Sequence, residues 1–141
     1  MAGLRCKALF ALCLTLGALG SAESKELAGG LPQRLRPPDL LQCSRDRLTA
    51  FQGQILDYRR GQQDISLRVR TDEQTTENFT LKWETSDKAE RWFLLRGEAF
   101  KAEDWKLIEN APGKLHDGMR VIVWVCGDGS KPVFDWRPKE S

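Results

Sequence analysis

The sequence has few of the residues from which most catalytic and metal sites are built. Among 141 residues it holds one histidine, one tyrosine and four cysteines. Because His116 is the lone histidine, a metal site made of several histidines is excluded, and most histidine-based catalytic clusters lack the residues that they need. We interpret His116, which stands beside Asp117 in an expected loop, as a structural or incidental residue.

The sequence also lacks a long hydrophobic run. No stretch of about 18 apolar residues occurs, so no transmembrane span is expected. A shorter apolar stretch, residues 8–19, follows the basic residues Arg5 and Lys7 and precedes the small residues at 20–22. This pattern is typical of a secretory signal peptide over residues 1–22, and it predicts a secreted or periplasmic protein.

The sequence has no excess of charge once that segment is removed. The segment carries two basic residues and no acidic ones, so the remaining chain has 20 residues of each sign. Affinity for nucleic acid depends mainly on the neutralisation of phosphates by basic side chains. We therefore do not expect a nucleic-acid-binding protein.

Two cysteines remain after residue 22, Cys43 and Cys126. In an oxidising compartment, a single pair of this kind predicts a structural disulfide. In the chain-entropy model, closing so long a loop stabilises the fold by roughly 4–5 kcal/mol at most. The alternatives are a reactive thiol and an intermolecular disulfide.

The chain after the signal divides into a leader and one domain. Residues 23–42 contain paired glycines and paired prolines, which predict an extended or flexible leader. Residues 43–138 are expected to form the domain, because apolar and polar residues alternate there as in half-buried strands. The almost unbroken apolar run at 119–126 predicts a central strand covered on both faces. The expected strands are 48–58, 65–71, 79–83, 119–126 and 133–136. A mixed segment between the third and the fourth contains a short strand-like stretch at 92–95 and a short helix at 102–110.

This order of elements predicts a mainly β domain. Gly53 provides a point where the first strand of a barrel can bend. Over about residues 48–137, the chain resembles small exported bacterial proteins of the OB-fold family in architecture. The resemblance implies a small five-stranded OB-like β-barrel with its helix between the third and fourth strands. An SH3-like barrel and an open α+β sheet are the alternatives. The expected core residues are Phe51, Ile55, Ile65, Leu67, Val69, Phe79, Leu81, Val121, Val123 and Val125.

Arginines mark the face of the sheet on which we expect a ligand. Arg59 and Arg60 fall in the first expected turn, and Arg68 and Arg70 alternate with apolar residues on the second strand. Side chains two residues apart on a strand lie about 6.5–7 Å apart. Guanidinium groups at this spacing suit carboxylates or phosphates. The alternative is a solvated face whose charge is balanced by nearby aspartates.

Five tryptophans form a second candidate, because exposed aromatic rings stack on sugars and bases. Trp83 and Trp136 stand at the ends of expected strands and are the predicted platform. Trp105 is expected on the apolar side of the helix, and Trp124 in the buried strand.

Three other features have simpler interpretations. Asp128 stands between two glycines and predicts a turn, because the ligand spacing of a calcium-binding EF-hand is missing. Asp135 and Arg137 predict an ion pair on one face of the last strand. Asn78 begins an N-glycosylation sequon, which matters only in a eukaryotic secretory pathway.

These features favour a non-enzymatic, exported binding or accessory domain without catalytic residues, metal or cofactor. An alternative is a structural protein of the cell envelope that docks through its leader or a sheet edge. A nuclease-like hydrolase is a third hypothesis, for which the necessary residues are missing. The ligand would be anionic, sugar-bearing or a protein segment. The predicted ligand-binding residues are Arg59, Arg60, Arg68, Arg70, Trp83 and Trp136.

Overall fold

The computed structural model describes residues 35–140, which form a mainly β structure with one α-helix of four residues. The predicted signal peptide and residues 23–34 of the predicted leader lie outside the described residues. Within residues 35–140, no helix has the length and apolar character needed to cross a membrane.

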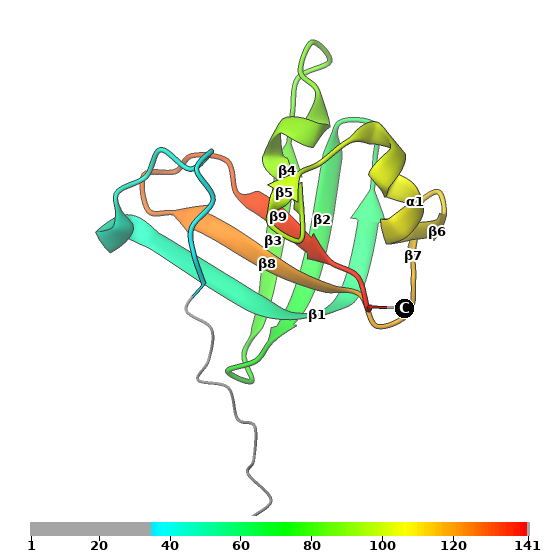
Figure 1. Ribbon diagram of the computed structural model, residues 1–141, viewed down its shortest axis with the longest axis horizontal. Helices are drawn as coiled ribbons and strands as arrows, with labels where there is room; N and C mark the ends of the chain where they lie inside the picture. The colour runs from blue at the N-terminus through cyan, green and yellow to red at the C-terminus, as the bar shows by residue number, and fades with distance from the viewer. Residues whose placement is uncertain (1–34, 141) are drawn as a thin grey trace, which may run out of the picture. The chain divides into compact units, whose positions relative to one another are not determined.

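Seven strands form the main sheet, in the order β3-β2-β1-β8-β9-β4-β5 (Figure 1). The contact between β4 and β9 is parallel, and the other strand pairs are antiparallel. β6 and β7 form a separate two-stranded sheet. The elements are η1 (Arg45–Arg47), β1 (Leu48–Arg60), β2 (Asp64–Thr71), β3 (Thr76–Lys82), η2 (Ala89–Trp92), β4 (Phe93–Leu95), β5 (Glu98–Ala99), η3 (Ala102–Asp104), α1 (Trp105–Ile108), β6 (Glu109–Ala111), β7 (Lys114–Leu115), β8 (Arg120–Cys126) and β9 (Val133–Arg137).

Strand β1 is long enough to pair with two neighbours. Its first half, from Leu48, lies against β8, and its second half, to Arg60, lies against β2. Gly53 stands at the change and pairs with both Thr71 and Val121. A Cβ at Gly53 would clash with the backbone of β2. A glycine is therefore required where β1 passes from one partner to the other.

The sheet is not closed into a barrel, so this part of the prediction was wrong. Closure would need hydrogen bonds between the edge strands β3 and β5. The edge strand β5 has only two residues. Between β3 and β4 the chain runs through a loop and η2 rather than through a strand that could close the sheet. The open sheet among the alternatives agrees with this topology, although the helical part is small.

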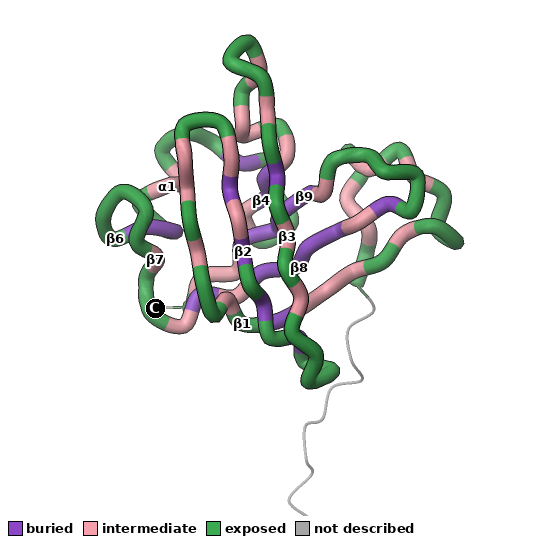
Figure 2. Tube along the Cα trace, turned by 180° about the vertical axis from the view of Figure 1, so that it is seen from behind, coloured by how far each residue is buried: buried purple, intermediate pink, exposed green. Residues whose placement is uncertain are grey.

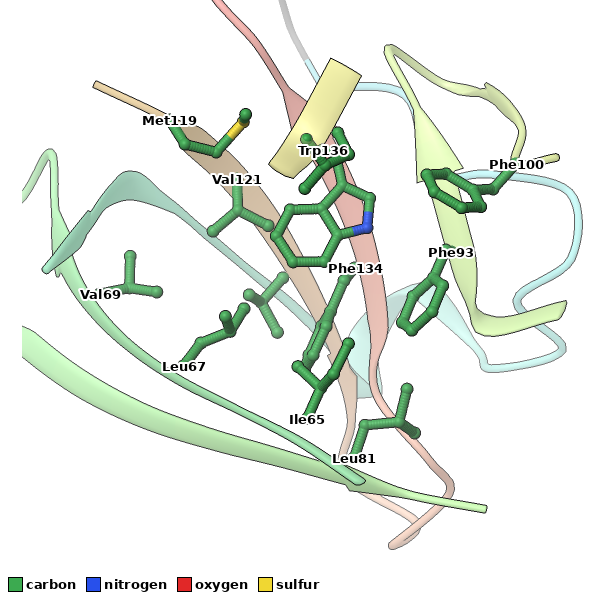
Figure 3. Packing of buried hydrophobic residues seen from close by; sticks show 12 residues of the cluster. Ile65, Leu67, Val69, Leu81, Phe93, Phe100, Met119, Val121, Phe134 and Trp136 are labelled. Atoms are coloured by element: carbon green, nitrogen blue, oxygen red, sulfur yellow. The ribbon is translucent and has the colours of Figure 1, made fainter. Parts of the chain in front are cut away.

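Two hydrophobic clusters lie on opposite faces of β8 and β9, because successive side chains on a strand point to opposite sides. The larger cluster contains Trp136, Phe134 and Phe93, which lie together in Figure 3. The smaller cluster contains Leu94, Ile122, Trp124 and Val133. Of the predicted core residues, Ile65, Leu67, Val69, Leu81, Val121 and Val123 are buried, and Phe51, Ile55, Phe79 and Val125 are partly buried against them. The prediction missed Phe93, Phe100, Ile108, Met119, Phe134 and Trp136.

The expected helix at 102–110 is shorter than predicted. It begins as η3, continues as α1 and ends at Ile108. Glu109 then pairs with Leu115 in the β6–β7 hairpin. Gly113 has a φ of 76° in the turn of that hairpin, a conformation that favours glycine. Pro112 and Gly113 therefore lie in the turn of a hairpin that the sequence analysis did not predict.

Candidate functional site on the outer face of strands β1 to β3

Strand β2 has one buried face and one exposed face. Ile65, Leu67 and Val69 are buried in the larger cluster, whereas Arg68 and Arg70 are exposed. Figure 2 shows the same alternation as changes of colour along β2. The alternation confirms the predicted strand and its two faces. We call the exposed side of β1, β2 and β3 the outer face.

A groove of about 560 Å³ crosses the outer face between two rows of side chains. Each row contains one residue from each of the three strands. Hydroxyl, amide and carboxylate groups lie in these rows beside two arginines. The first row is Arg59, Ser66 and Thr80, and the second is Asp57, Arg68 and Asn78.

The arginines of the outer face differ in their partners. Arg59 donates a hydrogen bond of 2.7 Å to Asp64 and is therefore already paired. Arg68 lies across from Asp57, and Arg70 lies two positions further along the same strand. Neither Arg68 nor Arg70 forms an ion pair with any residue between 35 and 140. These two guanidinium groups are therefore available to a ligand.

Arg60 belongs to a partly buried cluster and not to the outer face. It donates hydrogen bonds of 2.8 and 2.5 Å to the buried Glu109. Its guanidinium carbon lies 4.2 Å from the centroid of a Trp105 ring. The Tyr58 hydroxyl donates to the same carboxylate at 2.5 Å, and burial together with this hydrogen bond raises the pKa of Tyr58 above its ordinary value. These contacts commit Arg60 to holding the β6–β7 segment against β1, so the structure does not support its predicted role as a ligand-binding residue.

The predicted tryptophan platform does not form on the outer face. Trp136 has an exposed fraction of 0% and lies inside the larger cluster. Trp83 is partly buried and packs edge-on against Phe93, with ring centroids 6.3 Å apart. The predicted exposure of Trp136 was wrong because its side of β9 faces the larger cluster, where its ring packs against Tyr58, Phe93 and Trp105.

Another partly buried tryptophan, Trp92, was not singled out by the sequence. Lys131 lies 4.3 Å and Arg91 lies 5.2 Å from the centroid of a Trp92 ring. Trp92 lines a second groove of about 660 Å³. The neighbouring Arg91 was visible in the sequence, but the contact with Lys131 depends on the fold. Trp105 and Trp124 pack in the core, as predicted.

The two cysteines are free thiols in this structure, so the predicted disulfide is not formed. Cys126 is buried and Cys43 is partly exposed. Both line the same groove as Trp92. The structure therefore brings the predicted pair together without joining it.

Three smaller predictions can be compared with the structure. Asp128 accepts a hydrogen bond of 2.9 Å from the Ser130 amide, as expected of a turn-forming residue; hydrogen bonds from Ser130 also hold the pKa of Asp128 below its usual value. Arg137 forms an ion pair of 2.5 Å with the buried Asp135, which confirms that prediction. His116 hydrogen-bonds the Lys106 carbonyl group at 3.0 Å, consistent with a structural residue.

The residues that the structure describes contain no group of three or more histidine, cysteine, aspartate or glutamate side chains that could hold a metal ion. The two grooves thus offer charge, hydrogen bonds and aromatic surface. No known protein family, curated protein or solved structure matches this chain.

Proposed function

We propose that this chain is a non-enzymatic binding domain whose outer face binds an anionic glycan segment. The main evidence is a pair of exposed arginines. Arg68 and Arg70 have no ion-pair partner among residues 35–140. The buried side chains of the same strand fix the backbone that carries them. A rigid backbone lowers the entropy that is lost when a ligand is bound.

The groups around Arg68 suit a hydroxyl-rich ligand with acidic groups. Guanidinium groups bind carboxylates and sulfates with charge-assisted hydrogen bonds. Ser66, Thr80 and Asn78 can donate to and accept from sugar hydroxyls, and Asp57 can accept from them. A neutral glycan would leave the arginines without a partner, so acidic groups are part of the proposal.

Charge and hydrogen bonds, rather than ring stacking on tryptophan, would provide the affinity. Trp136 is buried and Trp83 packs on Phe93, so neither presents a free ring face to the groove. Affinity that depends on exposed charges falls as salt rises, because ions screen such charges. This dependence separates the proposal from a stacking platform.

The compartment belongs to the same proposal. The signal-like pattern of residues 1–22 supports export. A domain with these properties would act outside the cytoplasm on a polymer or surface that carries acidic groups.

The sheet edge supports a second candidate, the docking of a protein strand on β3. This strand has seven residues and has only β2 as a neighbour in the described part of the chain. However, Glu77 pairs with the buried Val69 and lies on the inner side of the edge. Inward-pointing charges of this kind protect sheet edges from pairing with other strands. Glycan binding on the outer face is therefore favoured over docking at the edge.

Amide chemical-shift mapping tests the proposal. The full chain, labelled with ¹⁵N, is titrated with a short polyuronate oligomer, and a neutral glucan oligomer of equal length is the control. The largest shifts are expected at residues 66–70 and 78–80, only with the polyuronate. Shifts centred on the groove of Trp92, or equal shifts with both oligomers, would contradict the proposal.

A further inference from the structure

The segment before β1 lies beside the end of strand β8. We call residues 38–47 the strap. The Gly127 amide donates a hydrogen bond of 2.8 Å to the Arg47 carbonyl group, and Leu48 pairs with Cys126 in the β1–β8 register. Leu41 packs against the smaller hydrophobic cluster. The strap is therefore held at two places, and Cys43 lies between them.

The two thiols line one groove at this end of β8. Cys126 is 5% exposed, whereas Cys43 is partly exposed, and both line the groove of about 660 Å³. Hydrogen bonding to Cys126 is the largest cause that raises the pKa of Cys43 to about 11. The shared groove, and the position of Cys43 between the two attachments of the strap, place the two thiols on the same side of this end of β8.

We propose that Cys43 and Cys126 are an oxidisable pair whose disulfide fastens the strap to the sheet. The oxidant is a disulfide, either a small one such as oxidised glutathione or that of a thiol–disulfide oxidoreductase. A Cys43 thiolate attacks one sulfur of the oxidant and releases one thiol. Cys126, after losing its proton, then attacks the mixed disulfide and releases the second thiol. One S–S bond forms, one is reduced, and the two protons end on the two thiols released.

The order of these steps follows from exposure. Cys43 is the thiol that an oxidant can reach, and the buried Cys126 is placed to resolve the mixed disulfide. Only the thiolate is nucleophilic, so a raised pKa slows the first step at neutral pH. Cys126 and Asp128 raise the pKa of Cys43, and Arg91 and Lys131 also line the groove. The reduced pair in this structure therefore reacts slowly with a weak oxidant, whereas an efficient oxidant can form the disulfide.

The disulfide would close a loop of roughly 80 residues, which restricts the unfolded chain strongly. We expect the melting temperature to rise by on the order of 10 °C or more on oxidation. The strap would also lose its freedom to detach from the smaller cluster, so that one wall of the Trp92 groove becomes fixed. This inference is independent of the ligand proposed for the outer face.

Peptide mapping tests the pair directly. The full chain is incubated with oxidised glutathione at about pH 8.5, where more thiolate is present, and is digested with trypsin without reductant. The expected product joins the peptides 35–45 and 121–139 and is lost on reduction. Cys6 and Cys13 fall in other tryptic peptides, so their bonds are distinguished.

The variant Cys43→Ser is the matched control, because it changes the more exposed thiol and leaves the buried one in place. Wild type should gain thermal stability on oxidation and lose it on reduction, whereas Cys43→Ser should show no such gain. The inference would be overturned if the two peptides carried only glutathione, or if Cys43 or Cys126 were bonded to Cys6 or Cys13. An unchanged melting temperature of the oxidised wild type would also overturn it.

Discussion

Strands β2 and β8 show how differently two halves of one sheet are covered. Along β2, buried residues alternate with the exposed Arg68 and Arg70. Along β8, the four residues from Val121 to Trp124 are all buried, because one cluster covers each face. The difference is visible in the sequence as period-two alternation on β2 and a continuous apolar run on β8.

This comparison limits where a ligand can bind. The β8–β9 half uses both faces for packing, so most of its side chains, at 121–124 and 133–136, are buried and stabilise the fold. The β1–β3 half uses one face for packing and leaves the outer face free. Substitutions should therefore affect folding in the first half and binding in the second.

The largest effect is expected at Trp136, in the half that is covered on both faces. Trp136→Ala should lower the free energy of unfolding by about 3–5 kcal/mol, because it removes a fully buried aromatic side chain. Trp83→Ala, at the partly buried tryptophan, is the control and should cost about 1–2 kcal/mol. Urea unfolding measures both. A loss at Trp83 equal to that at Trp136 would contradict the packing described for the two halves.

A smaller effect is expected at Glu109, which connects the two sheets. Glu109→Gln keeps the shape of the side chain but removes the charge that pairs with Arg60. We expect a loss of about 1–3 kcal/mol, because Arg60 is left partly buried without its carboxylate. Glu103→Gln, at an exposed residue that forms no ion pair within residues 35–140, should change stability by less than about 0.5 kcal/mol. Equal stability of the two variants in denaturant titration would refute this role of Glu109.

The local pattern of the sequence was sufficient for the strands that alternate or are continuously apolar. It predicted β2 and β8, because these depend on neighbouring residues. It did not predict the pairing of Arg60 with Glu109, since 49 positions separate them in the chain. Such a contact depends on how the β6–β7 segment folds back on β1.

The burial of Trp136 was missed for a related reason. Asp135 and Arg137 flank it, and polar neighbours at a strand end indicate exposure when only the sequence is considered. In the structure, Arg137 and the Gly97 amide hydrogen-bond the buried Asp135, so this polar residue can lie inside the sheet. The parallel pairing of β4 with β9 helps to bury this end of β9, and no local pattern in the sequence predicts that pairing.

The central claim is that Arg68 and Arg70 bind the ligand without contributing to folding. The direct measurement is the affinity of the full chain for polyuronate, compared between Arg68→Ala/Arg70→Ala and Arg45→Ala/Arg47→Ala. The second pair removes the same charge from exposed positions at η1, away from the outer face. We predict that the first pair weakens binding at least about tenfold and changes stability by less than about 0.5 kcal/mol, while the second pair leaves binding nearly unchanged. Equal weakening by both pairs, or no weakening by the first, would contradict the claim.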